Sequence, residues 1–504
     1  MDTLSPTSFW SVSTPDTTDD YPPLSSDIEV DVAIVGAGIT GLTTACHLKN
    51  AGKRVAVLDA GSVAAGTSSG TSAHLDAVPE HGASALIESV GLEAAQAITR
   101  GRMDAIAQIE AWSQAFSIDS EFKRVTAFSY SETPEDREAL VVELQGLRNL
   151  GLDAAAMVSE ELPFPFYGGC RIAQQARFRP VKYLQGLARA LHDERCTIYQ
   201  HTRMLPPEDG TPCRIQTVAG HTVHAQAVVL ATHSAFLGVS HLDTRIAPYQ
   251  SYVITAAVEQ GLADALYWDA AAPYHYIRLL NEHDSRILVV GGADHKTGQS
   301  DDERVHFTEL EQFVDRHFGL REVLFRWSAQ FFESSDHLPF IGRVPTRRHI
   351  YIGTGYSGVG LTYGTLAGKM ISELILHEAT PLGDVLSPSR IRLRESAGNY
   401  LRENFNVASH FVKDRLAAQS AEGQLLEKGT GSIVKEDGKV LAIYRDEAGK
   451  LHELEATCTH AGCIVQWNDA EKTWDCPCHG GRFSPEGVRL YGPPVHDLKP
   501  FTDE

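Results

Sequence analysis

The chain has 504 residues, of which 43% are hydrophobic, and carries a formal net charge of −21 at pH 7. This length predicts several domains with sizeable cores. The acidic excess argues against nucleic acid and anionic membranes as partners, because both attract basic surfaces. No run approaches the roughly 18 apolar residues of a membrane span, and residues 1–30 lack the pattern of a secretion signal. We therefore expect a cytoplasmic protein.

The first motif has the order strand, helix, strand. A buried-strand run at residues 30–35 precedes a G-x-G-x-x-G sequence at 36–41 and a helical stretch. A second strand over 54–58 ends at Asp59, which lies 23 residues after Gly36. Such glycines let a pyrophosphate approach the helix N-terminus, and such an acid can bind ribose hydroxyls. The unit predicts a dinucleotide site for FAD or NAD.

A loop rich in glycine and hydroxyl side chains follows at residues 66–74. Loops of this kind offer N–H and hydroxyl donors to phosphates and to a ring, although a plain surface turn has the same composition. His74 is the one titratable side chain in the loop. It is a candidate for contact with a flavin, even a covalent one, or simply a hydrogen-bonded neighbour.

The central part of the chain mixes helical and strand patterns. Apolar residues over 227–232 predict a buried strand that ends in small residues, where a nucleotide can approach. Residues 248–295 alternate like antiparallel strands, and this period places Tyr276 and Arg278 on one face. An arginine flanked by aromatic rings suits a substrate carboxylate. The alternative is a surface arginine packed on rings.

A second G-x-G-x-x-G occurs at residues 353–358. We reject an NAD(P)H site there, because residues 372–373, where a ribose acid should end a strand, fall inside a predicted helix that reaches about residue 377. The helix start at 358–362 instead suits a ring that becomes anionic on reduction. Residues 386–420 predict a solvated connecting helix, and from residue 421 short strands and turns predict a small antiparallel β domain.

Two loops of that last domain each carry a cysteine and a histidine at fixed offsets: Cys458 with His460, and Cys476 with His479. Two thiolates and two imidazoles form the ligand set of a Rieske [2Fe–2S] centre. A Cys₂His₂ zinc site uses the same residue types. Zinc requires neither the second cysteine in each loop nor the Pro-Cys-His-Gly turn, so the pattern favours the iron–sulfur centre.

These motifs resemble those of a known fusion family. The N-terminal part resembles the D-amino-acid-oxidase (glycine oxidase-like) superfamily of FAD oxidoreductases, and residues 421–504 resemble a Rieske domain. The oxidoreductase resemblance is carried by residues 36–41 with Asp59, 67–74, 228–232, 276–278 with 290–292, 336–342 and 353–362. It implies an α/β Rossmann-like FAD-binding domain, an antiparallel-sheet substrate domain and a C-terminal all-β Rieske domain.

The resemblance also implies domain limits. We expect an N-terminal arm over residues 1–28, an FAD-dependent oxidoreductase over 29–385, a linker helix over 386–420 and the Rieske domain over 421–504. Within the oxidoreductase, the FAD-binding parts cover about 29–85, 165–245 and 335–385, and the substrate cap covers about 86–164 and 246–334.

The family's cofactor residues carry over to named positions. Those expected to bind FAD are Gly36, Ala37, Gly38, Ile39, Thr40, Gly41, Asp59, Ala60, Gly66, Thr67, Ser68, Ser69, Thr71, Ser72, Ala73, His74, Met204, Ala231, Thr232, Gly355, Gly358, Val359, Gly360, Leu361 and Thr362. Tyr276 and Arg278 are the candidates for substrate binding.

The Rieske residues carry over individually. Cys458 and Cys476 would bind one iron, His460 and His479 the other, and Cys463 and Cys478 would form a disulfide. The respiratory relatives have serine and tyrosine where this chain has Gly481 and Phe483, so two hydroxyl donors that raise the potential are missing. We predict a potential in the lower half of the range of roughly −150 to +300 mV.

By this resemblance, the chain oxidises an amine or amino acid at its C–N bond by hydride transfer to FAD. The Rieske cluster then relays single electrons to an external protein or quinone. Two alternatives stay open: a partner reductase feeds the cluster and then the flavin for a monooxygenase or reductase reaction, or the chain is a non-catalytic electron-transfer or redox-sensing module.

Overall fold

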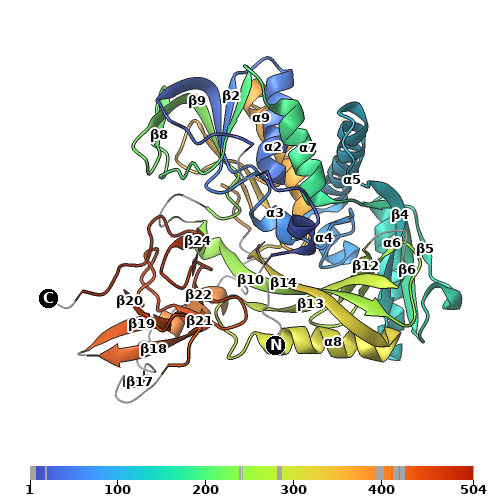
Figure 1. The fold of residues 1–504 in the computed structure, drawn as a ribbon. Coiled ribbons are helices and arrows are strands. Elements are labelled where there is room, and N and C mark those ends of the chain that lie inside the picture. The colour runs from blue at the N-terminus through green and yellow to red at the C-terminus, as the bar shows by residue number, and fades with distance from the viewer. Residues whose placement is uncertain are drawn as a thin grey trace.

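The computed structural model describes residues 7–17, 20–235, 237, 240, 242–280, 286–392, 402–407, 409–411, 419–420, 426–436 and 438–502. Its architecture consists of two large sheets with helices around them and a C-terminal domain of two small sheets (Figure 1). Among the described residues, no helix combines the length and apolarity that crossing a bilayer requires.

The first large sheet is built from β1 (Ile28–Val35), β2 (Val55–Leu58), β7 (Cys196–Tyr199), β8 (Cys213–Gln216), β9 (Thr222–Leu230), β15 (Phe340–Arg343) and β16 (Ile350–Thr354). Their order is β15-β16-β9-β1-β2-β7, with β8 paired to β9. All but β8 and β15 run parallel. Continuous apolar runs such as that of β2, whose four residues are all buried, suit strands covered on both faces.

Three helices lie together along this sheet: α2 (Ile39–Asn50), α7 (Pro180–Leu191) and α9 (Gly360–His377) (Figure 1). The long α5 (Leu92–Ala115) packs against α9. Close packing of α2 on α9 depends on Gly364 and Gly368, where a Cβ would lie 2.6 Å from side-chain atoms of Ile39 and Thr43. The sheet and these helices confirm the predicted α/β unit.

The second large sheet has nine strands: β3 (His74–Leu75), β4 (Lys123–Ser131), β5 (Ala154–Ala156), β6 (Gly168–Arg177), β10 (Ile246–Val258), β11 (Leu266–Asp269), β12 (Tyr276–Leu279), β13 (Ile287–Lys296) and β14 (Leu320–Ser334). The path β14-β10-β13-β12-β11-β4-β6-β3 is antiparallel except between β11 and β4. Helix α8 (Arg304–Phe318) packs on β10, β13 and β14 (Figure 1). Period-2 alternation over residues 248–295 therefore predicted the antiparallel strands β10, β11, β12 and β13 of this sheet.

Shorter elements complete this part of the chain. They are α1 (Phe9–Val12), α3 (Thr67–Gly70), α4 (Ala83–Val90), α6 (Arg137–Asn149), η1 (Pro134–Asp136), η2 (Ser159–Glu161) and η3 (Asp243–Arg245).

The C-terminal domain contains two four-stranded sheets. The first has β17 (Gln419–Ser420), β18 (Thr430–Glu436), β19 (Lys439–Arg445) and β20 (Leu451–Glu455), and the second has β21 (Gln466–Asn468), β22 (Thr473–Asp475), β23 (Arg482–Phe483) and β24 (Arg489–Tyr491). Apart from β17 with β18, neighbours in these sheets are antiparallel. The domain lies beside β10 and β14 of the large sheet (Figure 1).

The segment before this domain corrects one expectation. Residues 386–392 are not helical, and Arg390, which we expected on a solvated helix, is buried. Its guanidinium donates to both carboxylate oxygens of Asp336 at 2.7 Å. An alternating row of arginines indicates solvation only when no distant carboxylate binds one of them. Residues 402–407 and 409–411 are helical, and residues 393–401 and 412–418 of the predicted linker lie outside the described residues.

Candidate active site and metal centre

A cavity of about 640 Å³ lies between the two large sheets and the C-terminal domain. Its lining begins at the ends of β1 and β2, where Gly36, Gly38 and Asp59 lie, and reaches Tyr276 of the second sheet. The carboxyl ends of parallel strands are where open α/β sheets bind nucleotides. The predicted dinucleotide residues therefore open onto one continuous space.

The turn after β1 is shaped by its glycines. Gly36 has φ +109°, and a Cβ on it would lie 2.3 Å from the carbonyl oxygen of Ala231. A Cβ on Gly41 would lie 1.9 Å from the carbonyl oxygen of Gly36, so Gly41 serves helix packing and does not line the cavity. Helix α2 then begins after Gly38 with no acidic residue in its first turn. Its N-terminus thus carries no competing negative charge, which suits a phosphate.

Asp59 is held at the end of β2 by two backbone donors. Its Oδ2 accepts from the N–H of Ala37 at 2.6 Å, and its Oδ1 accepts from Gly61 at 2.8 Å. Both bonds fix the carboxylate on the cavity wall. This arrangement fits the ribose end of FAD, and Arg203 and Met204 line the same end.

The loop at residues 66–74 also faces the cavity. Ser68 Oγ accepts from the N–H of Ile39 at 3.2 Å. His74 Nδ1 bonds Ser72 Oγ at 2.9 Å, whereas its buried Nε2 has no hydrogen-bond partner among the described residues. Burial and the charge of Arg278 lower the pKa of His74 to about 3. The imidazole of His74 is therefore neutral, and it lines the cavity.

Most of the residues expected to bind FAD line this cavity. They are Gly36, Gly38, Ile39, Thr40, Asp59, Ala60, Gly66, Thr67, Ser68, Thr71, Ser72, His74, Met204, Ala231, Thr232, Gly358, Val359, Gly360 and Leu361. Ala37, Gly41, Ser69, Ala73, Gly355 and Thr362 lie behind that wall.

The sequence did not reveal two acidic residues in the far half of the cavity. Both oxygens of Glu80 lie 3.2 Å from the N–H of Gly358, and burial raises the pKa of Glu80 to about 7. Asp294 lies at the end of β13 with Oδ1 buried and unpartnered among the described residues, and burial raises its pKa to about 6. Neither residue belongs to a local motif, so only the tertiary fold brings them together.

The structure places only one of the two candidate substrate-binding residues, Tyr276 and Arg278, on the cavity wall. Tyr276 lines the cavity, and its hydroxyl lies 3.0 Å from Ser251 Oγ. Arg278 is 1% exposed and lies behind the wall, where its guanidinium donates to the carbonyl oxygens of Leu279, Ala73 and Phe178. Its donors are thus used by the backbone of the protein.

The predicted metal ligands converge at one tip of the C-terminal domain. Cys458 and Cys476 are buried, and their side chains hydrogen-bond each other. The rings of His460 and His479 lie 4.9 Å apart, and the Nδ1 of each is buried without a hydrogen-bond partner in the described structure. Backbone N–H groups of both loops point at the two sulfurs. Orphaned imidazoles beside paired thiols with N–H donors fit a [2Fe–2S] centre.

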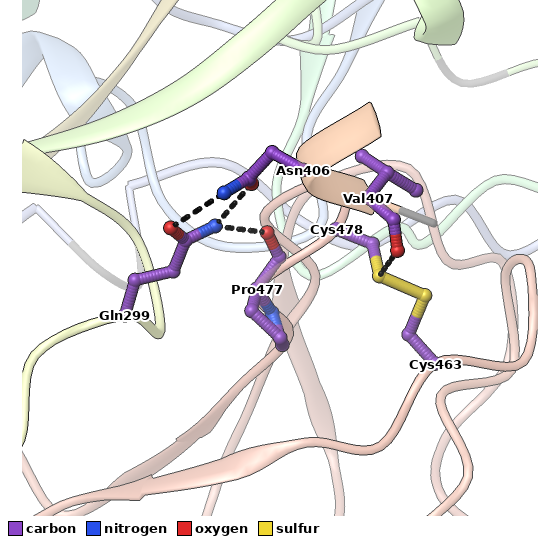
Figure 2. The surroundings of a disulfide bond; sticks show 6 residues. All are labelled: Gln299, Asn406, Val407, Cys463, Pro477 and Cys478. Atoms are coloured by element: carbon purple, nitrogen blue, oxygen red, sulfur yellow. Dashed lines mark hydrogen bonds between the residues drawn. A yellow bond between two sulfur atoms is a disulfide. The ribbon is translucent and has the colours of Figure 1, made fainter. Parts of the chain in front are cut away.

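Cys463 and Cys478 form a disulfide, which confirms the pairing (Figure 2). Beside it, Gln299 from the loop after β13 donates to the carbonyl oxygen of Pro477 at 3.1 Å and to Asn406 Oδ1 at 2.7 Å. The loop that carries the cluster ligands is therefore tied both to its partner loop and to the oxidoreductase domain.

The absence of a side chain at Gly481 also has a visible cause. A Cβ there would lie 2.6 Å from Pro494 and 3.3 Å from Cys458 Sγ. Pro494 therefore packs directly on Gly481, beside the sulfur of Cys458. Phe483, the second position where a hydroxyl is missing, is fully buried in the domain core.

The C-terminal domain also forms part of the cavity wall. Arg489, Leu490, Tyr491 and Gly492 line the cavity near its ribose end. Gln330 of β14 lines it as well, and its Nε2 donates to the carbonyl oxygen of Gly480 at 2.9 Å. Gly480 directly follows the predicted ligand His479, so one side chain spans from the cavity to the predicted metal loop.

Fold and site together define a flavin-type oxidoreductase joined to an iron–sulfur domain. The family models agree: residues 31–374 match the FAD dependent oxidoreductase family and residues 418–502 match the Rieske [2Fe-2S] domain. The chain belongs to the FAD dependent oxidoreductase family and ends in a Rieske domain. Its cofactors are FAD and a [2Fe–2S] cluster, so the zinc alternative is not supported.

Relatives and solved structures agree with this assignment. The chain is 30% identical to the Rieske 2Fe-2S iron-sulfur protein YhfW of Bacillus subtilis over 98% of its own length and 97% of that protein. It is 27% identical to the gamma-glutamylputrescine oxidoreductase of Escherichia coli over 71% of its own length and 86% of that protein. Glycine oxidase from Geobacillus kaustophilus shares the fold, with a TM-score of 0.61, 19% identity and coverage of 72% of this chain and 99% of the enzyme.

Proposed function

We propose that this protein oxidises the C–N bond of an amine and delivers the electrons through its iron–sulfur domain. The substrate loses a hydride from carbon and a proton from nitrogen, and water converts the resulting imine into a carbonyl group and an amine, which is ammonia when the substrate is a primary amine. FAD, when bound, takes up the hydride, and the cluster, when bound, carries one electron at a time to an external protein or quinone.

The charge of the cavity supports an amine over an amino acid. Glu80 and Asp294 face its far half, whereas the only arginines among its described lining residues are Arg203 and Arg489. Arg203 acts on Asp59 at the ribose end, and Arg489 lies near Arg203. A substrate ammonium thus meets carboxylates, and a substrate carboxylate meets no cation in the far half of the described wall.

The same carboxylates can manage the substrate proton. An ammonium must lose a proton before its carbon can release a hydride. Glu80, with its pKa raised to about 7 by burial, is matched to accept that proton near neutral pH. The N–H of Gly358 and the hydroxyl of Tyr274, 3.4 Å from Oε1, hold the carboxylate in place.

The shared wall is the observation that carries the relay. Residues of the Rieske domain close the FAD cavity, and Gln330 contacts both the cavity and Gly480. From the side chain of Gln330, a single hydrogen bond leads to the backbone of the loop that carries His479. An external reductase or a separate carrier is not needed to connect the two centres.

Anaerobic stopped-flow mixing of holoenzyme with matched compounds tests the proposal. Putrescine and ornithine differ by one carboxylate, as do pyrrolidine and proline. We expect the amine of a pair to bleach the flavin faster, and the cluster to bleach after the flavin. Preference for the amino acids would contradict the charge argument. A cluster that stays oxidised while the flavin is reduced would refute the relay.

A further inference from the structure

A buried acidic residue of the oxidoreductase domain faces the metal centre of the other domain. Asp243 begins η3 and is 3% exposed. Its Oδ2 lies 3.4 Å from Nε2 of His460, and both side chains are 2% exposed. We propose that Asp243 is a positioning residue for the Rieske centre, which orients His460 and lowers the reduction potential of the cluster.

The local geometry fixes which atoms face each other. Asp243 Oδ2 accepts from the N–H of Ser240 at 2.7 Å and from its hydroxyl at 2.9 Å, so the carboxylate cannot swing away. Its Oδ1 is buried and has no hydrogen-bond partner in the described part of the chain. Both ring nitrogens of His460 are buried without a hydrogen-bond partner in the described part of the chain, and Nε2 is the one that faces the carboxylate at 3.4 Å, so Nδ1 is the nitrogen left for iron.

The consequence for the ligand follows from the chemistry of metal-bound imidazole. A ligating histidine commonly gives its second ring N–H to a carboxylate, which fixes the ring orientation and makes the ligand more basic. A negative charge beside a cluster also opposes the arrival of an electron, and this effect is strong where water is excluded. Asp243 therefore lowers the reduction potential of the cluster, as does the lack of hydroxyl donors at Gly481 and Phe483.

Close packing between the two domains holds the loop after His479 against the oxidoreductase domain. A Cβ on Gly480, the residue after His479, would lie 2.4 Å from Pro248 and 2.7 Å from Gln330 Nε2. His479 forms no ion pair with a carboxylate among the described residues, although the charge of Asp243 also acts on its imidazole. Only His460 thus lies at ion-pair distance from Asp243, and that carboxylate belongs to the other domain.

This proposal depends only on the Rieske centre, so it does not require that the protein oxidises amines. The test is an EPR-monitored redox titration of full-length holoenzyme, wild type against Asp243→Asn. At a fixed ambient potential we expect the ratio of reduced to oxidised cluster to rise about tenfold, which is ~59 mV for a one-electron couple. Asp243→Glu, which keeps the charge, should stay close to wild type.

Asp469→Asn is the matched control. Asp469 lies in the contact between the two domains, 3.5 Å from Arg304, and this substitution also removes one negative charge. Among the described ion pairs, Asp469 has none with a cluster histidine. This variant should leave the cluster potential unchanged. An unchanged potential in Asp243→Asn, or an equal rise in Asp469→Asn, would overturn the proposal.

A second measurement uses only the wild-type protein, so it remains informative even if the Asp243→Asn variant fails to assemble its cluster. Pulsed EPR of the reduced wild-type protein reports the couplings of the remote imidazole nitrogens. We expect two distinct values, because Asp243 lies within ion-pair distance of His460 and not of His479 in the described structure. Two equal values in the wild type would overturn the proposal whatever the variants do.

Discussion

A glycine at the domain contact offers a sharp test of the shared site. Gly298 follows β13 with φ +70°, and a Cβ there would lie 2.9 Å from the carbonyl oxygen of Asp475 and 3.0 Å from the nitrogen of Pro477. Both atoms are backbone and flank the ligand Cys476. Gly298→Ala therefore forces the metal loop away from the oxidoreductase domain.

Gly151 separates backbone strain from this clash. It has φ +88°, and a Cβ there would have no neighbour within 4 Å. Both alanine variants incur the cost of a positive φ, ~1–2 kcal/mol. Only Gly298→Ala adds an overpacking cost of ~1–3 kcal/mol. Restoring ordinary contact requires a shift of about 0.5 Å, enough to forfeit roughly a quarter of each facing dispersion contact.

The assay uses flavin reduction by light, which requires no substrate. After the pulse, bleaching of the cluster reports electron transfer between the centres, and urea unfolding followed by cluster absorbance reports stability. We expect Gly298→Ala to slow the transfer and to lower the urea midpoint more than Gly151→Ala does. Equal behaviour of the two variants would refute the view that this contact sets the distance between the centres.

Three further predictions concern the cavity and the metal loops. Because burial raises the pKa of Glu80 to about 7, its carboxylate fraction grows as pH rises through neutrality, so KM for an amine should fall over that range. Glu80→Gln should raise KM and remove this dependence, and a flat wild-type profile would contradict the assignment. Replacing Cys463 and Cys478 together with serine opens a loop of 15 residues and should cost ~3 kcal/mol; an unchanged urea midpoint of cluster bleaching would contradict this. Arg278→Met leaves three carbonyl oxygens without their donor and should destabilise the fold by ~1–3 kcal/mol without changing the preference between putrescine and ornithine. A selective loss of ornithine turnover would instead place Arg278 at the substrate.

Local chemistry explains what could be predicted from the sequence. The pyrophosphate turn requires glycines and an acid at short fixed spacing, as Gly36 and Asp59 show. The cluster loops likewise require cysteine and histidine two or three residues apart. Such patterns can be recognised in the sequence because each is complete within one or two adjacent elements. The alternation over residues 248–295 can be recognised for the same reason.

Side chains whose partners are distant in sequence were not predictable in this way. Arg390 appeared to belong to a solvated row of arginines, but its partner Asp336 lies 54 residues earlier and the pair is buried. Glu80 and Asp294 come from a loop and a strand end that share no motif, and they meet only in the folded cavity.

The role of the C-terminal domain in the cavity changes how the two cofactors must be understood. If the Rieske domain were a tethered carrier, its surface would be complete without the oxidoreductase, and Gln330 would not need to reach it. Instead Gln330 Nε2 donates to Gly480 beside a cluster ligand, while its Oε1 is buried and has no partner among the described residues. Tyr491 lines the cavity, where burial raises the pKa of its hydroxyl and the charge of Asp59 adds to that rise. A wall built from both domains forms only when they are docked. Under the proposed relay, cofactor binding and electron transfer would depend on the same contact, and a change there should affect both.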